Sequence, residues 1–549
     1  MATPTATTFS YIDYIVFALS LVLSAAIGVY HGCIGSKQTT TDEFLMGGKN
    51  MGVIPVALSM CASFLSGIQV LGQPAEMYYY GTQYCFFTFC IILAYPITAS
   101  VFVPIFHGLQ VTSAYEYLEL RFNKTVRTLG AMTFILQMGG MKAVIWTDAF
   151  QMVVILVGLL AVIVKGTMDV GGMDEVFRIS DEGGRLIFFN MDPDPTTRTT
   201  FWSMIIGGAF VCLSAYATNQ ATVQRYMSIK NTKRANYALW LNAPLWTLFT
   251  ILFMLMGLTA YAKYHDCDPV LAQHIDRPDQ LVPYFVLDTL GFLRGLPGLF
   301  VASCFSAALS TVSSGVNSLS AVVLEDMAKP FYTRWHGRQL DVHLATTWSK
   351  YIALFFGVLN VILALLVQLI GAGMIEIALS FFGMVGGPLL GVFAMGMLCP
   401  VVNSAGAQDP DAFLHYIHNL DWLRSLRPYT RDPYASRRNS LIKLPKLDMN
   451  PMTTIITETP DDNYLYRISY MWYTMISVIV CTLVGVAVSC ATGRNKKPAI
   501  ARLFWPPVLR YSCFLPPIIA VEEKKTNMTG ITYRANELPE KEPLNNTPV

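Results

Sequence analysis

Charged residues are scarce in this chain, and their scarcity excludes most classes of soluble protein. Asp, Glu, Lys and Arg make up 13% of the 549 residues, whereas hydrophobic residues make up 53%. An average soluble domain carries about 25% charged residues. The 38 basic and 36 acidic residues nearly balance, so the chain has no basic field that would hold a nucleic acid. The composition predicts a membrane protein and argues against a soluble enzyme, a disordered scaffold or a nucleic-acid binder.

The sequence motifs of metal, redox and nucleotide chemistry are also missing. None of the 11 cysteines forms a C-x-x-C pair, so neither a zinc site nor a disulfide framework is indicated. The eight histidines fall between hydrophobic segments or at their ends, which leaves no ligand cluster at membrane depth for a metal or a haem. No glycine-rich phosphate-binding motif occurs. We therefore expect no enzyme, no organic cofactor and no ATP-driven pump.

Long apolar segments recur along the chain. A bilayer core about 30 Å thick requires roughly 20 mostly apolar residues per helix. Ten segments have this character: residues 11–30, 52–73, 82–107, 129–164, 201–222, 237–262, 295–325, 348–371, 375–399 and 467–491. No charged n-region precedes the first segment, so we interpret it as a membrane helix and not as a signal peptide. The sequence predicts an all-α, multi-pass membrane protein.

Positive charge between the segments sets the orientation in the membrane. If the N-terminus lies outside, then linkers 31–51, 108–128, 223–236 and 326–347 lie inside, and each contains Lys or Arg. The acid-rich linker 166–200 then lies outside. We divide the chain into a transmembrane core (1–400), a polar and cytoplasmic linker (401–466), a last membrane helix (467–491) and a disordered tail (492–549).

Two of the apolar segments are too polar to face lipid. Residues 52–80 contain serines, glycines and glutamines, and residues 295–325 contain seven serines, a threonine and an asparagine. Unsatisfied polar groups are costly in hydrocarbon, so these helices must face protein or water. Small hydroxyl residues also serve as plain helix-packing residues in membranes. Ala307, Ser310, Thr311 and Ser314 fall on one helical face, and hydroxyls with freed carbonyls suit a hard cation such as Na⁺.

Five segments carry a resemblance to a known family: residues 112–122, 139–148, 219–226, 308–318 and 386–391. With these motifs the chain resembles the sodium:solute symporter family from about residue 8 to residue 400. Ala62-Ser63-Phe64 and Val70-Leu71-Gly72 favour the branch of sodium-coupled monocarboxylate, multivitamin and iodide transporters. The resemblance implies a leucine-transporter-type bundle at the plasma membrane, with two inverted five-helix repeats after one extra N-terminal helix. It also implies Na⁺-coupled symport of a small organic anion by alternating access.

The resemblance also implies the site residues. One sodium site would use backbone carbonyls of Ala62 and Leu65 together with Ala307, Ser310 and Thr311. The second cation site would use Asp148, Ser313 and Ser314. An acidic residue inside an apolar segment is a functional candidate, although pairing of Asp148 with Lys142 at a helix end is the alternative. The substrate would contact Phe64, Gln69 and Tyr216, for which helix packing is the alternative.

Two parts of the family pattern are missing from this chain. Family members place two further spans between Thr128 and the motif at Gly139, where only residues 129–138 stand. About ten residues cannot cross a bilayer. We therefore expect 129–164 to form a single crossing, and the first repeat to lack about two of its five helices. A late helix is also missing after Gln408. Its loss either reverses the direction of the last helix across the membrane or is compensated by another part of the chain.

The sequence predicts a Na⁺-coupled symporter whose partners are a small anionic solute and the lipid bilayer. The alternative is a transport-deficient short form that regulates or binds a full-length symporter, because an incomplete first repeat leaves the wall around the sodium site unfinished. Neither the substrate nor the oligomeric state can be derived from these residues.

Overall fold

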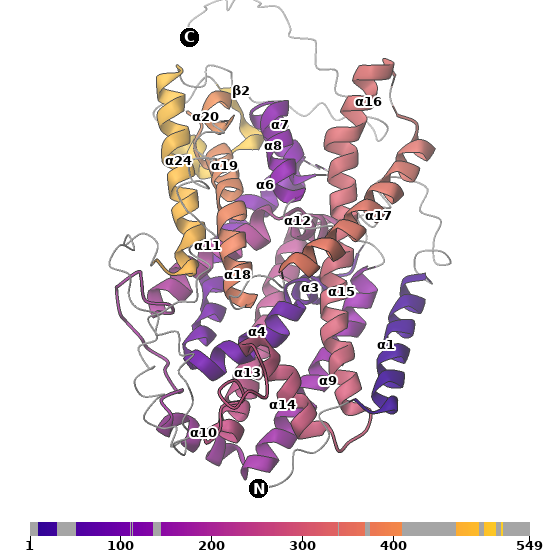
Figure 1. Ribbon diagram of the computed structural model, residues 1–549. Coiled ribbons are helices and arrows are strands. Elements are labelled where there is room, and N and C mark those ends of the chain that lie inside the picture. The colour runs from indigo at the N-terminus through magenta and orange to yellow at the C-terminus, as the bar shows by residue number, and fades with distance from the viewer. Residues whose placement is uncertain are drawn as a thin grey trace, which may run out of the picture.

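The computed structural model describes residues 9–29, 51–109, 111, 113–135, 144–338, 340–367, 374–408, 468–493, 499–511 and 518–519. Helices make up nearly all of the regular structure in this part of the chain (Figure 1). The exception is a parallel pair of two-residue strands, β1 (Ala499–Ile500) and β2 (Ile518–Ile519). The predicted all-α class is confirmed.

Each predicted apolar segment overlaps at least one apolar helix of the described part. Among the described residues, five helical segments can cross a bilayer by length and composition: Thr82–Leu109, Met152–Val170, Thr232–Tyr264, Ile375–Leu398 and Tyr470–Ala491. Helices α3 (Val53–Phe64) and α4 (Gly67–Tyr80) form a further crossing that is bent by 61°. Shorter apolar helices occupy Tyr11–Leu23, Ser203–Thr218, Leu296–Phe305 and Thr347–Ile362. The prediction of a multi-pass membrane protein is confirmed.

The first half of the chain begins with α1 (Tyr11–Val29), which precedes the bent helix. The next crossing is continuous and consists of η3 (Thr82–Cys90), α5 (Ile91–Ile97), η4 (Thr98–Phe102) and α6 (Val103–Leu109). Then follow α7 (Ala114–Arg121), α8 (Lys124–Ile135), α9 (Val144–Val170) and α10 (Met173–Glu182).

The second half starts with a crossing built from η5 (Ser203–Gly207), α11 (Gly208–Leu213), η6 (Ser214–Thr218) and α12 (Gln220–Met227). After it come α13 (Thr232–Tyr264), η7 (Pro278–Gln280), α14 (Leu281–Leu290), α15 (Leu296–Val322), η8 (Val323–Ala328), α16 (Lys329–His336) and α17 (Val342–Val367). The remaining helices are α18 (Met374–Phe381), η9 (Phe382–Gly386), α19 (Gly387–Leu398), α20 (Ser404–Gln408), η11 (Tyr470–Trp472), α24 (Tyr473–Ala491), η12 (Ala501–Leu503) and α25 (Pro506–Tyr511).

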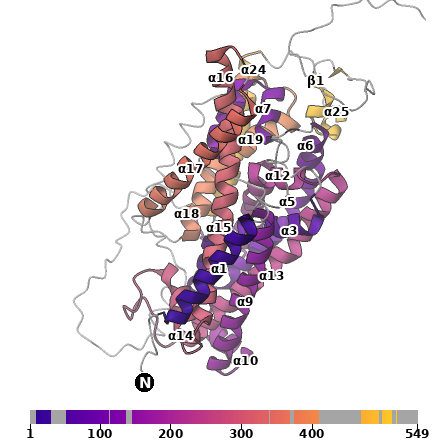
Figure 2. The same ribbon diagram turned by 90° about the vertical axis from the view of Figure 1, so that its right-hand side faces the viewer.

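The bent helix lies at the centre of the bundle. Both α13 and α15 pack against α3, α4 and α9. The extra helix α1 runs along α15 on the outside of the bundle (Figure 2). Asp13 of α1 fixes this contact, because its carboxylate accepts hydrogen bonds from the backbone N–H groups of Gly295 (2.7 Å) and Gly298 (3.2 Å) at the start of α15. A carboxylate is favoured at a helix N-terminus.

The region between residues 129 and 164 is described only in part. We expected a short stub fused to the following helix as one crossing. The structure describes α8 and α9 on either side of residues 136–143, which are outside the described part, so the single crossing stays a prediction. Helix α8 packs against α7 and α20. Helix α9 has 27 residues. A 27-residue helix is about 40 Å long, so α9 is long enough to cross a bilayer by itself, and its part Met152–Val170 is apolar enough to do so.

The last helix runs in the same direction as α18 and α19. Its first residues lie at the end of the molecule that carries the acidic linker, because Ser469 N–H donates to the Pro195 carbonyl at 2.9 Å. Its other end lies beside α20, where Asn403 Nδ2 donates to Thr492 Oγ1 at 2.9 Å. Figure 1 shows α10 and α14 at one end of the molecule, and α7, α16 and α20 at the other. The predicted linker at 401–466 lies outside the described residues from 409 onward and stays a prediction.

Part of the tail that we expected to be disordered is folded. Leu503 and Phe504 are buried, and the Leu503 carbonyl accepts a hydrogen bond from the Tyr117 hydroxyl at 3.1 Å. The guanidinium of Arg121 lies 4.7 Å from the centre of the Phe504 ring. Prolines make this segment a poor membrane span, but they do not prevent a short segment from burying an aromatic ring against a cation.

Candidate functional site

The bent helix is interrupted at Leu65 and Ser66. Leu65 has φ −77° and ψ 61°, and Ser66 is extended, with φ −75° and ψ 168°. The helical ladder of i to i−4 hydrogen bonds therefore stops after Leu65 and restarts in α4, which frees backbone carbonyls of the last turn of α3. Ala62 and Leu65 lie in or beside this turn and are buried. A broken helix of this kind can offer carbonyl oxygens to a cation.

Helix α15 passes directly beside this break. A Cβ atom placed on Gly67 would lie 3.7 Å from the Ala308 Cβ and 3.7 Å from the Cys304 carbonyl oxygen. The predicted sodium residues Ala307, Ser310 and Thr311 lie within one turn of Ala308 on α15. The structure therefore brings the two polar helices together. The side chains of these three residues lie outside the described part, so their coordination of Na⁺ stays a prediction.

The second cation site also remains a prediction. Asp148 lies on α9, and Ser313 and Ser314 lie on α15, the two helices that pack against each other. None of these three side chains is among the described ones. The two helices that carry these residues are neighbours in the bundle, and the role of the residues as cation ligands remains a prediction.

Two of the three predicted substrate residues meet in space. The rings of Phe64 and Tyr216 have centroids 4.8 Å apart, although the residues are far apart in sequence. Both rings stand next to breaks, because Phe64 ends α3 and Tyr216 lies three residues before Asn219. Gln69 lies on α4 after the first break and is half-buried, and its side-chain oxygen accepts a hydrogen bond from Gln73 Nε2.

The second break was not predicted. We expected residues 201–222 to form one apolar segment, but Asn219 leaves the helical conformation with φ −69° and ψ 121°. Its side chain then caps α12 by accepting a hydrogen bond from the Ala221 N–H at 3.0 Å. The signal was present in the sequence, because Asn is a preferred N-cap residue and here directly follows an apolar run.

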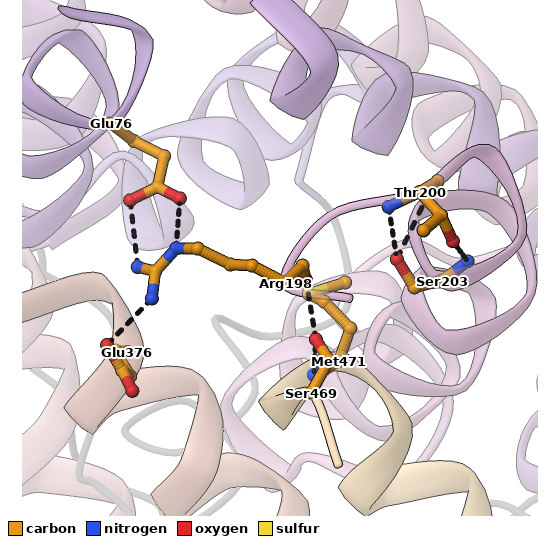
Figure 3. A network of polar contacts seen from close by, with 7 residues as sticks. All are labelled: Glu76, Arg198, Thr200, Ser203, Glu376, Ser469 and Met471. Carbon is orange, nitrogen blue, oxygen red and sulfur yellow. Dashed lines mark hydrogen bonds and ion pairs between the residues drawn. The ribbon is translucent and has the colours of Figure 1, made fainter. Parts of the chain in front are cut away.

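A buried ion network connects several elements near the acidic linker (Figure 3). Arg198 Nε and Nη2 donate to the two carboxylate oxygens of Glu76 on α4 at 2.9 and 3.1 Å, and Nη1 donates to Glu376 on α18 at 2.9 Å. Ser469, before α24, donates to the Arg198 carbonyl at 2.6 Å. Burial lowers the pKa of Arg198, but Glu76, the two tyrosine rings nearby and Glu376 offset this effect, so the pKa is raised. The guanidinium therefore stays charged.

A second buried arginine connects the two broken helices. Arg225 on α12 donates through Nε to Ser59 Oγ on α3 at 2.9 Å, and through Nη1 to the Ala221 carbonyl at 2.9 Å. The sequence analysis placed Arg225 in a cytoplasmic linker, whereas it is almost fully buried. It therefore links α3 and α12, one half of each broken helix.

The family model that matches this chain is the sodium:solute symporter family, which covers residues 44–138 and 125–409. The chain belongs to the sodium:solute symporter family. This membership makes Na⁺ the coupled ion and a small molecule the solute, and it confirms that the protein is a transporter and not an enzyme. The two matched blocks meet at residues 125–138, which is where the sequence analysis places the missing helices.

Curated relatives of this symporter match along most of its length. Sodium-coupled monocarboxylate transporter 1 of Homo sapiens is 39% identical over 550 residues, which cover 89% of this chain and 88% of the relative. The sodium-dependent multivitamin transporter of Oryctolagus cuniculus is 37% identical, with 93% and 87% covered. Since 89% of 549 residues is about 489, about 60 of the 550 aligned positions in the first comparison belong to the relative alone. That length would suffice for two or three spans of about 20 residues.

A solved structure supports the fold. The outward-open, substrate-bound state of a Na⁺-coupled sialic acid symporter superposes with a TM-score of 0.69, covering 89% of this chain and 100% of that one. The two sequences are 22% identical, so this likeness concerns the fold alone. It confirms the leucine-transporter-type bundle that the resemblance implied.

Proposed function

We propose that this protein carries Na⁺ and a small organic carboxylate together across the plasma membrane by alternating access. The observation that carries the proposal is the position of α15, which packs against both α3 and α4 and passes so close to their break that a Cβ atom on Gly67 would contact it. Freed carbonyls and hydroxyls at that point provide the oxygen ligands that a hard cation prefers. The relatives named as monocarboxylate and multivitamin transporters support the substrate class.

For the sodium site we propose the carbonyls of Ala62 and Leu65 with Ala307, Ser310 and Thr311. For a second cation we propose Asp148, Ser313 and Ser314. Neither site needs an arginine or an organic cofactor.

For the substrate we propose a carboxylate held near the N-terminus of α4, with its apolar part against Phe64 and Tyr216. Helix α4 has 14 residues and begins at Gly67, close to the Phe64 ring. The N–H groups at the start of the helix and the positive end of the helix dipole favour an anion there. Gln69, in the first turn of α4, offers a further amide donor. The two aromatic rings supply the apolar surface.

Tracer uptake tests the proposal directly. Cells that express the full chain should accumulate short radiolabelled monocarboxylates in Na⁺ medium and not in choline medium. A panel of monocarboxylates, biotin-like vitamins and halides would identify the solute. If the protein reaches the cell surface but shows no Na⁺-dependent uptake of any of these, the proposal is wrong and the regulatory short form becomes the better interpretation.

Removing the hydroxyls of Ser310 and Thr311 tests the sodium site. We expect the double alanine variant to raise the Na⁺ concentration for half-maximal uptake about tenfold, since loss of two ligands should cost more than 1.4 kcal/mol. The matched control is Ser303→Ala on the same helix, because the Ser303 hydroxyl donates to the Phe300 carbonyl of its own helix at 2.6 Å. Equal Na⁺ dependence in both variants would exclude the proposed ligands.

A further inference from the structure

A buried amide on α13 connects the two broken helices. Asn242 has 0% exposure. Its Oδ1 accepts hydrogen bonds from the Tyr95 hydroxyl at 2.9 Å and from the Tyr216 hydroxyl at 3.2 Å. Its Nδ2 donates to the Ala57 carbonyl of α3 at 3.4 Å. One side chain thus contacts the crossing that contains Tyr95, the first broken helix and the second broken helix.

The chemistry of these groups fixes the orientation of the amide. A phenol hydroxyl can donate or accept, whereas the Ala57 carbonyl can only accept, so the amide nitrogen must face Ala57 and the oxygen faces the two hydroxyls. Because the site excludes water, losing either partner leaves buried polar groups unsatisfied, which is costly.

The same contacts determine where the Tyr216 ring stands. Its hydroxyl is anchored to Asn242, one side of the ring meets Phe64 at 4.8 Å, and the Tyr95 ring packs edge-on at 5.1 Å. Tyr216 lies in η6, three residues before the break at Asn219, where a free helix end would otherwise allow the ring to move. The anchored hydroxyl therefore holds the ring against Phe64.

We infer that Asn242 is a positioning residue for the solute site. It holds Tyr216 against Phe64 and connects that aromatic pair to α3 through the Ala57 carbonyl. The inference rests on the proposed function and deepens it, because a rigid aromatic wall admits a carboxylate with a short, slim apolar part and excludes a bulky one. Asn242 acts through Tyr216 and does not itself bind the solute.

A double-mutant cycle tests this inference. Asn242→Leu and Tyr216→Phe both remove the hydrogen bond between Tyr216 and Asn242. Tyr216→Phe should raise the KM for a short monocarboxylate about fivefold, the effect of one lost buried hydrogen bond. Asn242→Leu also removes the bonds to Tyr95 and Ala57, so its KM should rise at least as much. The maximal rate per surface molecule should stay within about twofold if only binding changes. The double variant should be no worse than Asn242→Leu alone, because both act through one contact. Discrimination between a short and a branched monocarboxylate should fall in all three variants.

The matched control is Thr250→Val on α13. Thr250 is buried, and its hydroxyl donates to the Trp246 carbonyl of its own helix at 3.0 Å, so KM and discrimination should not change. Surface biotinylation normalises all rates. If Asn242→Leu fails to reach the surface, Tyr216→Phe alone still tests the contact, because it keeps the ring and removes only the hydroxyl.

The outcomes separate this inference from the proposed function. Absence of Na⁺-dependent uptake by the unaltered protein overturns the proposed function, and the inference with it. Normal uptake by the unaltered protein combined with an unchanged KM in Tyr216→Phe, or with effects of the two substitutions that simply add, overturns the inference alone.

Discussion

Single residues of this protein take their roles from neighbours that are remote in sequence. Glu76, Arg198 and Glu376 would each be an isolated buried charge, which is strongly unfavourable. Together they form two ion pairs around one guanidinium, and the rings of Tyr80 and Tyr470 lie 4.2 and 5.2 Å from the Arg198 Cζ. The network stabilises the structure only as a set, because removing one partner leaves the others without compensation.

Replacing Arg198 with Leu should destabilise the protein. Two carboxylates would remain buried without a cation, and breaking a buried pair in this way costs about 3–5 kcal/mol. Thermal unfolding of the purified protein in detergent should show a lower Tm, and adding Glu76→Gln and Glu376→Gln should restore part of the loss. Arg178→Leu is the control, because Arg178 forms its ion pairs with Glu175 and Glu182 on an exposed surface. A Tm that falls equally in both variants would mean that the buried network has no special role.

Pairs of helices are arranged by small residues that the sequence analysis did not interpret. Gly383, Gly387 and Gly391 recur every four residues along η9 and α19 and face α24. A Cβ atom on Gly387 would lie 2.4 Å from the Ser477 Cβ, and one on Gly391 would lie 3.0 Å from the Cys481 Cβ. Small residues at this spacing let membrane helices approach closely. The matching steps along both helices show that α19 and α24 run parallel.

Adding a methyl group at Gly387 should weaken this helix pair. Gly387→Ala forces α24 away from α19, and overpacking of this kind costs about 1–3 kcal/mol. We expect a lower Tm in detergent and less protein at the cell surface. Gly357→Ala on α17 provides the matched control, since nothing lies within 4 Å of a Cβ placed there. An undiminished Tm for Gly387→Ala would show that α24 does not depend on this close approach.

The molecule as a whole keeps its last helix in a definite orientation. Ser469 lies beside the linker predicted to be outside, and residues 489–492 lie beside Asn403 at the opposite end. The contact of Phe504 with Arg121 adds a further link at that end. The sequence left the direction of α24 open, and the packing against α19 decides it. The tail after α24 should therefore start on the cytoplasmic side.

Epitope tags test this topology. We expect an antibody to detect a tag at the N-terminus on intact cells, and a tag after Val549 only after the cells are permeabilised. The sequons at Asn527 and Asn545 should carry no glycan. Detection of the C-terminal tag on intact cells, or a glycan on either asparagine, would contradict the orientation of α24 described above.

The pattern of apolar segments in the sequence was sufficient to predict the helices and their membrane character. Each of the ten predicted segments overlaps at least one apolar helix, because the cost of exposed backbone polar groups in lipid forces such segments to become helical. The interruption near Ser66 was also indicated by its polar and glycine residues. Motif resemblance gave Phe64 and Tyr216, which the fold brings into ring contact.

Local pattern could not determine the contacts between distant elements. Asn242, Arg198 and Arg225 have no sequence signal of their role, since the partners of each are remote in sequence and meet only when the helices pack. The same is true of the direction of α24, because hydropathy is identical for a helix and for its reverse. The composition of the chain therefore determined that it folds as membrane helices, whereas side-chain packing and hydrogen bonding between those helices decided which polar groups face one another.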